Sequence, residues 1–209
     1  MYQICVFGDS ISFGRGDNLN RGWCGRLRKY FEVKDYYNCL QNLSICGDTT
    51  KTLLKRFDCE AKARIKFLRS EDRNIIIIAI GLNDSRLSFP NKLYDTKIAQ
   101  FRKNIIKLCK KAKKFTEEVT FIGLTPVDEE ICKNYEETVF SNNRINEFNN
   151  TIKEICEKNN IPFLDIFQEF SKSNYTELLD DGLHINSKGY EKMYELIKIF
   201  LVKNNLIEK

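Results

Sequence analysis

The sequence contains a single histidine, and its surroundings suit it to proton transfer. His184 lies in a glycine-containing segment, 180–186, with Asp181 three residues before it. A carboxylate at this spacing can accept a hydrogen bond from Nδ1 and hold the imidazole in the tautomer whose Nε2 takes a proton. The alternative is an exposed loop histidine with no chemical role. His184 alone leaves both interpretations open, so the pattern needs a nucleophile.

Ser10 is a candidate nucleophile, because it follows the first apolar segment at the point where the chain must turn. Gly8 and Gly14 give the backbone room for that turn. The same junction could instead cap a helix or bind a phosphate. The loop contains neither Gly-x-Gly-x-x-Gly nor Gly-Lys-Ser/Thr, and Ser12 stands where the Gly-x-Ser-x-Gly elbow of the α/β-hydrolases needs its second glycine.

Two further residues could stabilise the oxyanion that forms during acyl transfer. Gly47 and Asn83 each follow an apolar segment that we expect to be a strand. A glycine lets its backbone N–H approach a substrate closely, and an asparagine amide is a neutral donor. Taken singly, both are explained equally well as turn residues. The neighbouring Asp9 and Asp84 are interpreted as structural acceptors for loop N–H groups rather than as a catalytic carboxylate pair.

The elements that must position these residues alternate between strands and helices. Five apolar segments predict buried strands, and amphipathic stripes that begin near Trp23, Leu54, Ile98, Ile145 and Tyr190 predict helices between and after them. The predicted strands are 1–7, 37–43, 74–80, 119–124 and 161–166. This alternation predicts a three-layer α/β/α sandwich, with ligands bound beyond the carboxyl ends of the strands.

The chain shows no repeat, linker or low-complexity tract, so residues 1–209 are predicted to form a single domain. The least patterned stretches, 85–95, 127–138 and 169–180, are predicted to be rim loops. Trp23 could line an acyl pocket, but we expect it in the core. Aromatic and aliphatic residues of two rim loops suggest an apolar acyl site: Phe89, Leu93, Tyr94, Tyr135, Val139 and Phe140.

Four blocks of residues, taken together and in this order, resemble the SGNH (GDSL) hydrolase family. They are Gly-Asp-Ser after the first strand, Gly47 after the second, Gly-x-Asn-Asp after the third, and Asp-x-x-His before the last helix. The resemblance implies a flavodoxin-like five-stranded parallel sheet in the order 2-1-3-4-5. The sequence departs from the family pattern at two positions. Ile11 stands where a leucine is usual after the serine, and Ile185 stands where a proline often follows the histidine.

By this resemblance, Ser10 is the nucleophile, His184 the base and Asp181 the orienting acid. The N–H groups of Ser10 and Gly47 and the side chain of Asn83 form the oxyanion hole. The implied activity is that of a serine esterase or lipase that cleaves carboxylic esters or thioesters through an acyl-enzyme on Ser10. The alternatives are an acyltransferase, a carbohydrate O-deacetylase or, less favoured, a non-catalytic binding module.

Composition narrows the cofactors, partners and compartment that we expect. The chain has 34 basic and 29 acidic residues, and the lysine-rich run 107–114 lies on the solvated face of a predicted helix, so nucleic-acid binding is not predicted. No metal-ligand cluster or cofactor motif is present, and the resemblance requires none. Eight scattered cysteines, without a signal sequence or membrane-length apolar run, predict a cytoplasmic protein. The resemblance implies a small-molecule ester as its substrate.

Overall fold

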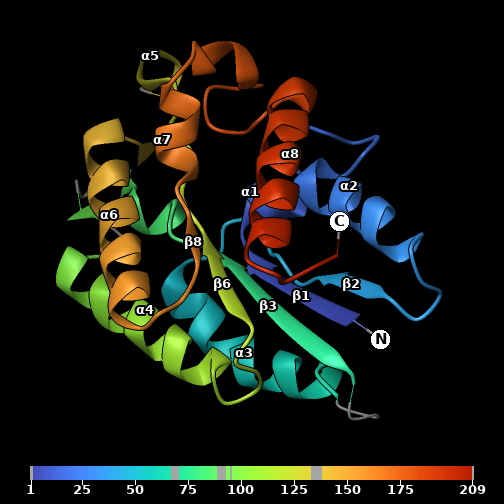
Figure 1. Cartoon of the computed structure of the whole chain (residues 1–209). Coiled ribbons are helices and arrows are strands. Elements are labelled where there is room, and N and C mark those ends of the chain that lie inside the picture. Colours follow the sequence, from blue (N-terminus) through green and yellow to red (C-terminus); the bar gives the residue numbers. More distant parts are fainter. Residues whose placement is uncertain (1, 67–70, 89–92, 95, 133–137, 209) are drawn as a thin grey trace.

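A parallel five-stranded sheet runs through the centre of the protein (Figure 1), as seen in a computed structural model that describes residues 2–66, 71–88, 93–94, 96–132 and 138–208. Its strands are β1 (Tyr2–Gly8), β2 (Cys39–Asn42), β3 (Arg73–Ala79), β6 (Val119–Ile122) and β8 (Phe163–Leu164). They lie in the order β2-β1-β3-β6-β8, and all neighbours are parallel. Counted along the chain this order is 2-1-3-4-5, which confirms the prediction.

Helices cover both faces of the sheet (Figure 1). On one face α2 (Gly22–Glu32) packs against α8 (Ser187–Lys203). On the other face α4 (Ile98–Ala112) packs against both α3 (Thr50–Arg64) and α6 (Asn142–Lys158). The predicted α/β/α sandwich is therefore confirmed, and each amphipathic stripe of the sequence that falls in the described residues lies in one of these five helices.

The core explains why the third strand has no polar alternation. The four residues from Ile75 to Ile78 are each at most 1% exposed, because helices cover both faces of β3. Phe7 on β1 packs against Phe57 on α3 with ring centroids 4.5 Å apart. Trp23 is completely buried, which confirms its assignment to the core.

Most of the short elements lie in or beside the stretches predicted as rim loops, so those predictions are corrected in detail, whereas α1 directly follows β1. The helices are α1 (Ser10–Phe13), α5 (Glu129–Cys132) and α7 (Ile166–Ser171), with 3-10 turns η1 (Asn83–Ser85) and η2 (Tyr175–Leu178). A small antiparallel sheet joins β5 (Leu93–Tyr94), β4 (Leu87–Ser88) and β7 (Thr138–Val139), in the order β5-β4-β7. Strands of two residues have no periodicity that a sequence pattern could reveal.

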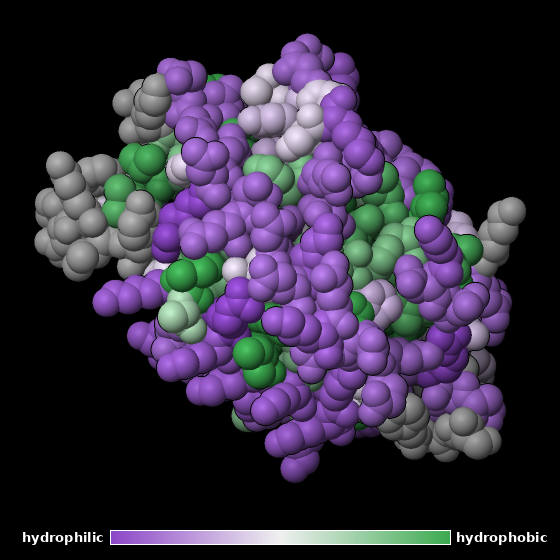
Figure 2. All heavy atoms as spheres, turned by 60° about the vertical axis from the view of Figure 1, so that its left-hand side comes forward, coloured by the Kyte–Doolittle hydropathy of each residue, from purple (hydrophilic) through white to green (hydrophobic). Residues whose placement is uncertain are grey.

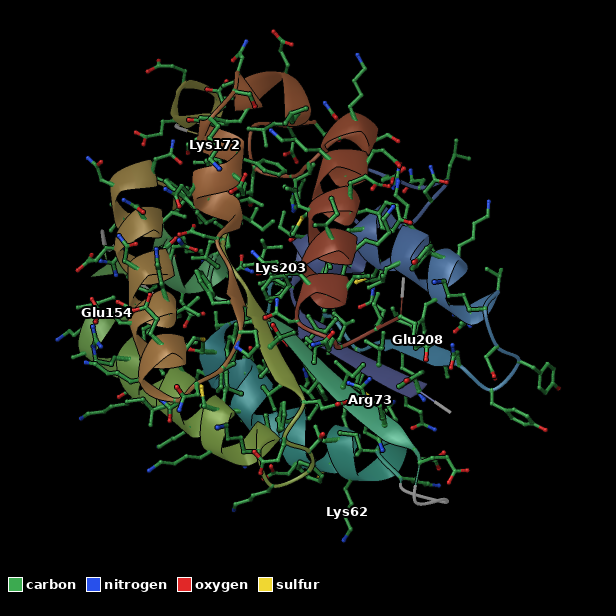
Figure 3. The ribbon with its side chains drawn as sticks, viewed as in Figure 1. Lys62, Arg73, Glu154, Lys172, Lys203 and Glu208 are labelled. Atoms are coloured by element: carbon green, nitrogen blue, oxygen red, sulfur yellow. The ribbon has the colours of Figure 1, made fainter. Side chains whose placement is uncertain are left out.

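The outward faces of the helices are charged. Figure 3 shows Lys62, Glu154 and Lys172 projecting away from the sheet, and the face in Figure 2 is mainly hydrophilic with separated apolar patches. Within the lysine-rich run, Leu108 is buried whereas Lys107 is exposed, as the helical stripe predicts. In the described part of the chain, no helix combines the length and apolarity needed to span a membrane.

The connections of the sheet create a crevice at its carboxyl edge. The chain leaves β1 toward β2 on one side, and then crosses back to β3 on the other side of β1. Sheets of this type bind ligands where the strand order reverses, beyond the carboxyl ends of the strands. The segments that follow β1, β2 and β3 carry Ser10, Gly47 and Asn83, and therefore meet at this switch point.

Candidate active site

Ser10 is the first residue of the short helix α1, directly beyond β1. The preceding Asp9 caps this helix, because its carboxylate accepts a hydrogen bond from the Ile11 N–H at 3.0 Å. A Cβ atom on Gly8 would lie 2.6 Å from Ser12 Oγ and 2.7 Å from the Ala79 carbonyl oxygen. Only glycine therefore lets α1 fold back so closely on the sheet, and this turn fixes the position of the Ser10 hydroxyl.

Three predicted residues form a hydrogen-bonded chain. The Ser10 Oγ lies 3.0 Å from His184 Nε2, and His184 Nδ1 lies 2.7 Å from Asp181 Oδ2. Ser10 and His184 are buried, although 174 residues separate them in the sequence. Because Nδ1 faces the carboxylate, it carries the proton, and Nε2 is left to accept the proton of the serine hydroxyl.

The Asp181 carboxylate is held by the turn that carries the histidine. Its Oδ1 accepts the backbone N–H groups of Leu183 at 3.0 Å and His184 at 2.7 Å. Partial burial raises the pKa of Asp181, but the hydrogen bonds from the His184 side chain and backbone and from Leu183 outweigh it, so the net pKa lies below its ordinary value. Asp181 is therefore ionised at neutral pH and keeps the imidazole oriented.

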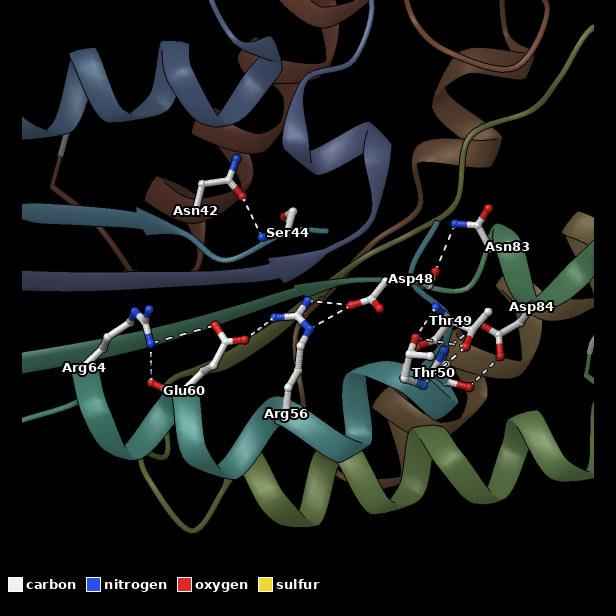
Figure 4. Close-up of polar contacts among 11 residues, drawn as sticks. Asn42, Ser44, Asp48, Thr49, Thr50, Arg56, Glu60, Arg64, Asn83 and Asp84 are labelled. Carbon is white, nitrogen blue, oxygen red and sulfur yellow. Dashed lines mark hydrogen bonds and ion pairs between the residues drawn. The ribbon is translucent and has the colours of Figure 1, made fainter. Parts of the chain in front are cut away.

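The predicted oxyanion donors face the same pocket as the serine and the histidine. Neither the Ser10 N–H nor the Gly47 N–H donates to any acceptor within the described residues. Gly47 has a φ of 80°, a conformation that favours glycine. The Asn83 amide gives one hydrogen to the Asp48 carbonyl oxygen at 2.9 Å (Figure 4), which orients its second hydrogen for another acceptor.

The pocket has a volume of about 290 Å³. Besides the predicted site residues, it is lined by Arg15, Cys46, Arg86, Thr138, Phe140 and Leu183. Phe140 was predicted from the sequence as part of an acyl site, whereas the two arginines were not predicted. The signal that could have found them is their spacing from site residues: Arg15 is five residues after Ser10, and Arg86 three after Asn83. A larger hollow of about 650 Å³ between α2 and β2 contains none of the predicted site residues.

The predicted apolar acyl site is only partly visible. Phe140 is buried against the pocket, and Val139 is half-buried in β7. Phe89 and Tyr135 lie outside the described residues, as do the side chains of Leu93 and Tyr94. The described wall combines Phe140 and Leu183 with polar and cationic groups, so it is mixed rather than uniformly apolar.

The two extra aspartates are structural, as expected. Asp84 is completely buried and accepts hydrogen bonds from the Thr50 N–H at 2.8 Å, the Thr50 hydroxyl at 2.6 Å and the Thr96 hydroxyl at 3.0 Å. Asp84 thus ties α3 to the turn that carries Asn83.

Burial raises the pKa of Asp9 to about 7. The charges of Asp84 and Asp48 add to the effect of burial, and the hydrogen bond from the Ile11 N–H opposes it.

The ligand sets that metals require are not found in the structure as described. Nowhere in its described ranges do three or more His, Cys, Asp or Glu side chains lie together as a metal site would need. All eight cysteines are free, and five of them are buried among apolar side chains.

A family model for the GDSL-like lipase/acylhydrolase family matches residues 6–192. The chain belongs to this family. That finding confirms the resemblance drawn from the four blocks, all of which lie inside the matched range. The matched range covers nearly the whole sandwich, from within β1 to the first turns of α8.

Known proteins are similar to this chain in sequence or in fold. The esterase TesA of Pseudomonas aeruginosa is 28% identical over 121 residues, a match that covers 58% of this chain and 53% of that protein. The match thus spans about half the length of that curated relative. Among solved structures, the lipase/acylhydrolase from Enterococcus faecalis has a TM-score of 0.76 at 23% identity, covering 98% and 97% of the two chains. An acetylxylan esterase from Geobacillus stearothermophilus has a TM-score of 0.74 at 16% identity, with 95% and 93% covered.

Proposed function

We propose that this GDSL-family protein is a serine esterase that cleaves carboxylic esters or thioesters through an acyl-enzyme on Ser10. The observation that carries the proposal is the hydrogen-bonded chain from Ser10 Oγ through His184 to Asp181, at the wall of a pocket that also holds Gly47 and Asn83. The relative TesA is described as an esterase, which agrees with this chemistry.

In the proposed first step, Ser10 Oγ attacks the carbonyl carbon of the substrate while His184 Nε2 takes the hydroxyl proton. The negative charge moves to the carbonyl oxygen, where the N–H groups of Ser10 and Gly47 and the free hydrogen of the Asn83 amide stabilise it. The tetrahedral intermediate collapses, and His184 gives its proton to the departing alcohol or thiol. The acyl group remains as an ester on Ser10.

In the second step water takes the place of the leaving group. His184 removes a proton from the water as it attacks the acyl carbon, and returns that proton to Ser10 Oγ when the carboxylic acid leaves. A cytoplasmic location suits the free cysteines, and small-molecule esters suit the size of the pocket.

A fluorophosphonate probe tests the nucleophile directly. We expect covalent labelling of the wild type at Ser10 and none of Ser10→Ala. Ser12→Ala is the matched control, because Ser12 is buried on the same helix and its hydroxyl has no hydrogen-bond partner in the described structure. Labelling that persists in Ser10→Ala would overturn the proposal. His184→Ala should lower ester turnover by about 10³-fold or more.

A further inference from the structure

The pocket around Ser10 is bordered by positive charge. Arg15 and Arg86 line it, whereas none of its ten described lining residues is an aspartate or glutamate. Acidic residues are common in this chain, which has 29 of them, so composition does not explain why none is among the described lining residues. Asp181 contacts the opposite edge of the imidazole and does not line the pocket. A substrate that enters therefore meets two guanidinium-bearing residues.

The backbone of Arg15 is fixed relative to the nucleophile. Its N–H donates to the Ser10 carbonyl oxygen at 3.1 Å, and its own carbonyl oxygen accepts the hydroxyl of the buried Tyr190 at 2.9 Å. The glycines on either side have positive φ angles, 93° at Gly14 and 90° at Gly16. The arginine side chain thus leaves the chain from an anchored turn beside Ser10.

The charge of Arg15 is not used within the described structure. Arg26 and Arg56 are each bound by two carboxylates. Arg15, by contrast, is exposed, and its side chain makes no hydrogen bond or ion pair with any residue in the described ranges. A guanidinium with five N–H donors beside a reactive serine is suited to a carboxylate or phosphate oxygen from a ligand.

Arg86 lines the same pocket from the segment that carries Asn83. It follows η1 directly, its N–H contacts the Asn83 carbonyl oxygen at 3.5 Å, and its side chain is half-buried. Both arginines therefore stand on the segments that carry proposed oxyanion donors. The charge of Arg15, unpaired within the described ranges, adds to the potential in the pocket, and Arg86 brings a second guanidinium-bearing residue to the same wall.

We propose that the preferred substrates of this site are anionic esters, whose carboxylate or phosphate group binds Arg15 in a pocket that Arg86 also lines. This proposal rests on the proposed esterase function and adds the substrate class. A planar guanidinium can bind a carboxylate or phosphate through two parallel hydrogen bonds, which a neutral ester of the same shape cannot form. The anion can stand on the acyl side or on the alcohol side of the ester.

Two pairs of synthetic esters separate these sources of charge. In the first pair, the p-nitrophenyl monoester of adipic acid carries its charge on the acyl side, and p-nitrophenyl hexanoate is its neutral partner. In the second pair, the acetyl ester of 4-hydroxybenzoate carries its charge on the alcohol side, and the acetyl ester of methyl 4-hydroxybenzoate is its neutral partner. The quantity measured is the ratio of kcat/KM for the charged ester to that for its neutral partner, in the wild type, Arg15→Gln and Arg86→Gln. Arg102→Gln, on α4 and paired with the exposed Glu154, is the matched control for loss of one positive charge.

For at least one pair, we expect Arg15→Gln to lower the ratio by about 10-fold or more and Arg86→Gln to lower it less, with Arg102→Gln equal to the wild type. High salt should lower the wild-type ratio in the same direction. A ratio that is the same in wild type and Arg15→Gln for both pairs would overturn the charge selectivity while leaving the esterase intact. Absence of Ser10-dependent cleavage of all four esters would instead overturn the proposed function itself.

Discussion

The side-chain amide of Asn83 donates a hydrogen bond to the backbone carbonyl oxygen of Asp48 at 2.9 Å, and both groups are buried (Figure 4). The bond joins the turn after β3 to the loop after β2, which also carries Gly47. Two proposed oxyanion donors from different strand ends are therefore held in one frame. An amide already fixed by one hydrogen bond needs no reorganisation when its second hydrogen meets the developing charge.

Replacement of Asn83 with alanine should lower kcat by about 10²- to 10³-fold, because one donor to the oxyanion is lost. Asn74→Ala is a matched control. Its amide likewise donates to a backbone carbonyl oxygen, that of Lys66 at 3.0 Å, but at the amino end of β3, away from the pocket. Steady-state kinetics with a p-nitrophenyl ester checks the difference. Equal losses of kcat in the two variants would contradict a role in oxyanion stabilisation.

Arg56 supports the same frame from α3. Its Nε and Nη2 donate to Asp48 Oδ2 at 2.8 Å and 2.7 Å, and its Nη1 donates to Glu60 Oε1 at 3.0 Å (Figure 4). Arg56→Gln should lower kcat by roughly 10-fold with little change in KM, because Asp48 and Gly47 lose their fixed position. Arg56 is a positioning residue, and we expect Arg56→Lys to recover part of kcat through a single contact with Asp48.

The control for Arg56 is Arg28→Gln, which removes an exposed ion pair to Glu32 on α2. Surface pairs of this kind contribute about 0–1 kcal/mol, so this variant should match the wild type in kcat. Thermal unfolding of all the variants separates positioning from stability. If Arg56→Gln raised KM alone, or if its activity loss merely followed a loss of folded protein, the positioning role would be wrong.

The raised pKa of Asp9 has a consequence for stability. In the folded protein burial raises it from the ordinary 3.8 to about 7. Between these two pH values the folded state holds a proton that the unfolded state has released, so stability falls as pH rises from about 4 to 7 and is then constant. Asp9→Asn keeps an acceptor for the Ile11 N–H and removes this titration.

Urea unfolding of wild type and Asp9→Asn at pH 5 and pH 8 measures the effect. From pH 5 to pH 8, the free energy of unfolding of the wild type should fall relative to that of Asp9→Asn by up to about 3 kcal/mol. The other titrating groups are shared by the two proteins and cancel in the comparison. A difference between the proteins that is independent of pH would show that the pKa of Asp9 is not raised in the folded protein.

The sequence predicted the sheet because its signals were local. The unbroken apolar run at Ile75–Ile80 is what a parallel strand covered on both faces requires, and the helical stripes mark the faces turned toward it. The edges were less predictable. The last strand, expected over 161–166, is only Phe163–Leu164, because it pairs with β6 alone and Asp165 already caps α7.

The sequence predicted which residues lie together at the candidate site, but not all the contacts that hold them in position. Ser10, Gly47 and Asn83 follow strands, and Asp181 and His184 precede the last helix, positions where residue type and spacing carry information. The support given by Asp48 had no signal, because its link to Asn83 uses a backbone oxygen that every residue possesses. The pairing of β4 with β5 and β7 likewise arises from tertiary contacts between two-residue segments, which no periodicity reveals.

Cys46 offers a chemical probe of the pocket, because it is exposed, lies next to Gly47 and lines the wall that contains Ser10. An acetamide group added to its sulfur would occupy space needed by the substrate. Iodoacetamide should therefore abolish most ester cleavage by the wild type, whereas whatever activity Cys46→Ala retains should survive the reagent. Cys59 is also exposed, on α3, but does not line the pocket, so Cys59→Ala should be inactivated like the wild type. Mass spectrometry locates the adducts, and inactivation that persists in Cys46→Ala would place the sensitive thiol elsewhere.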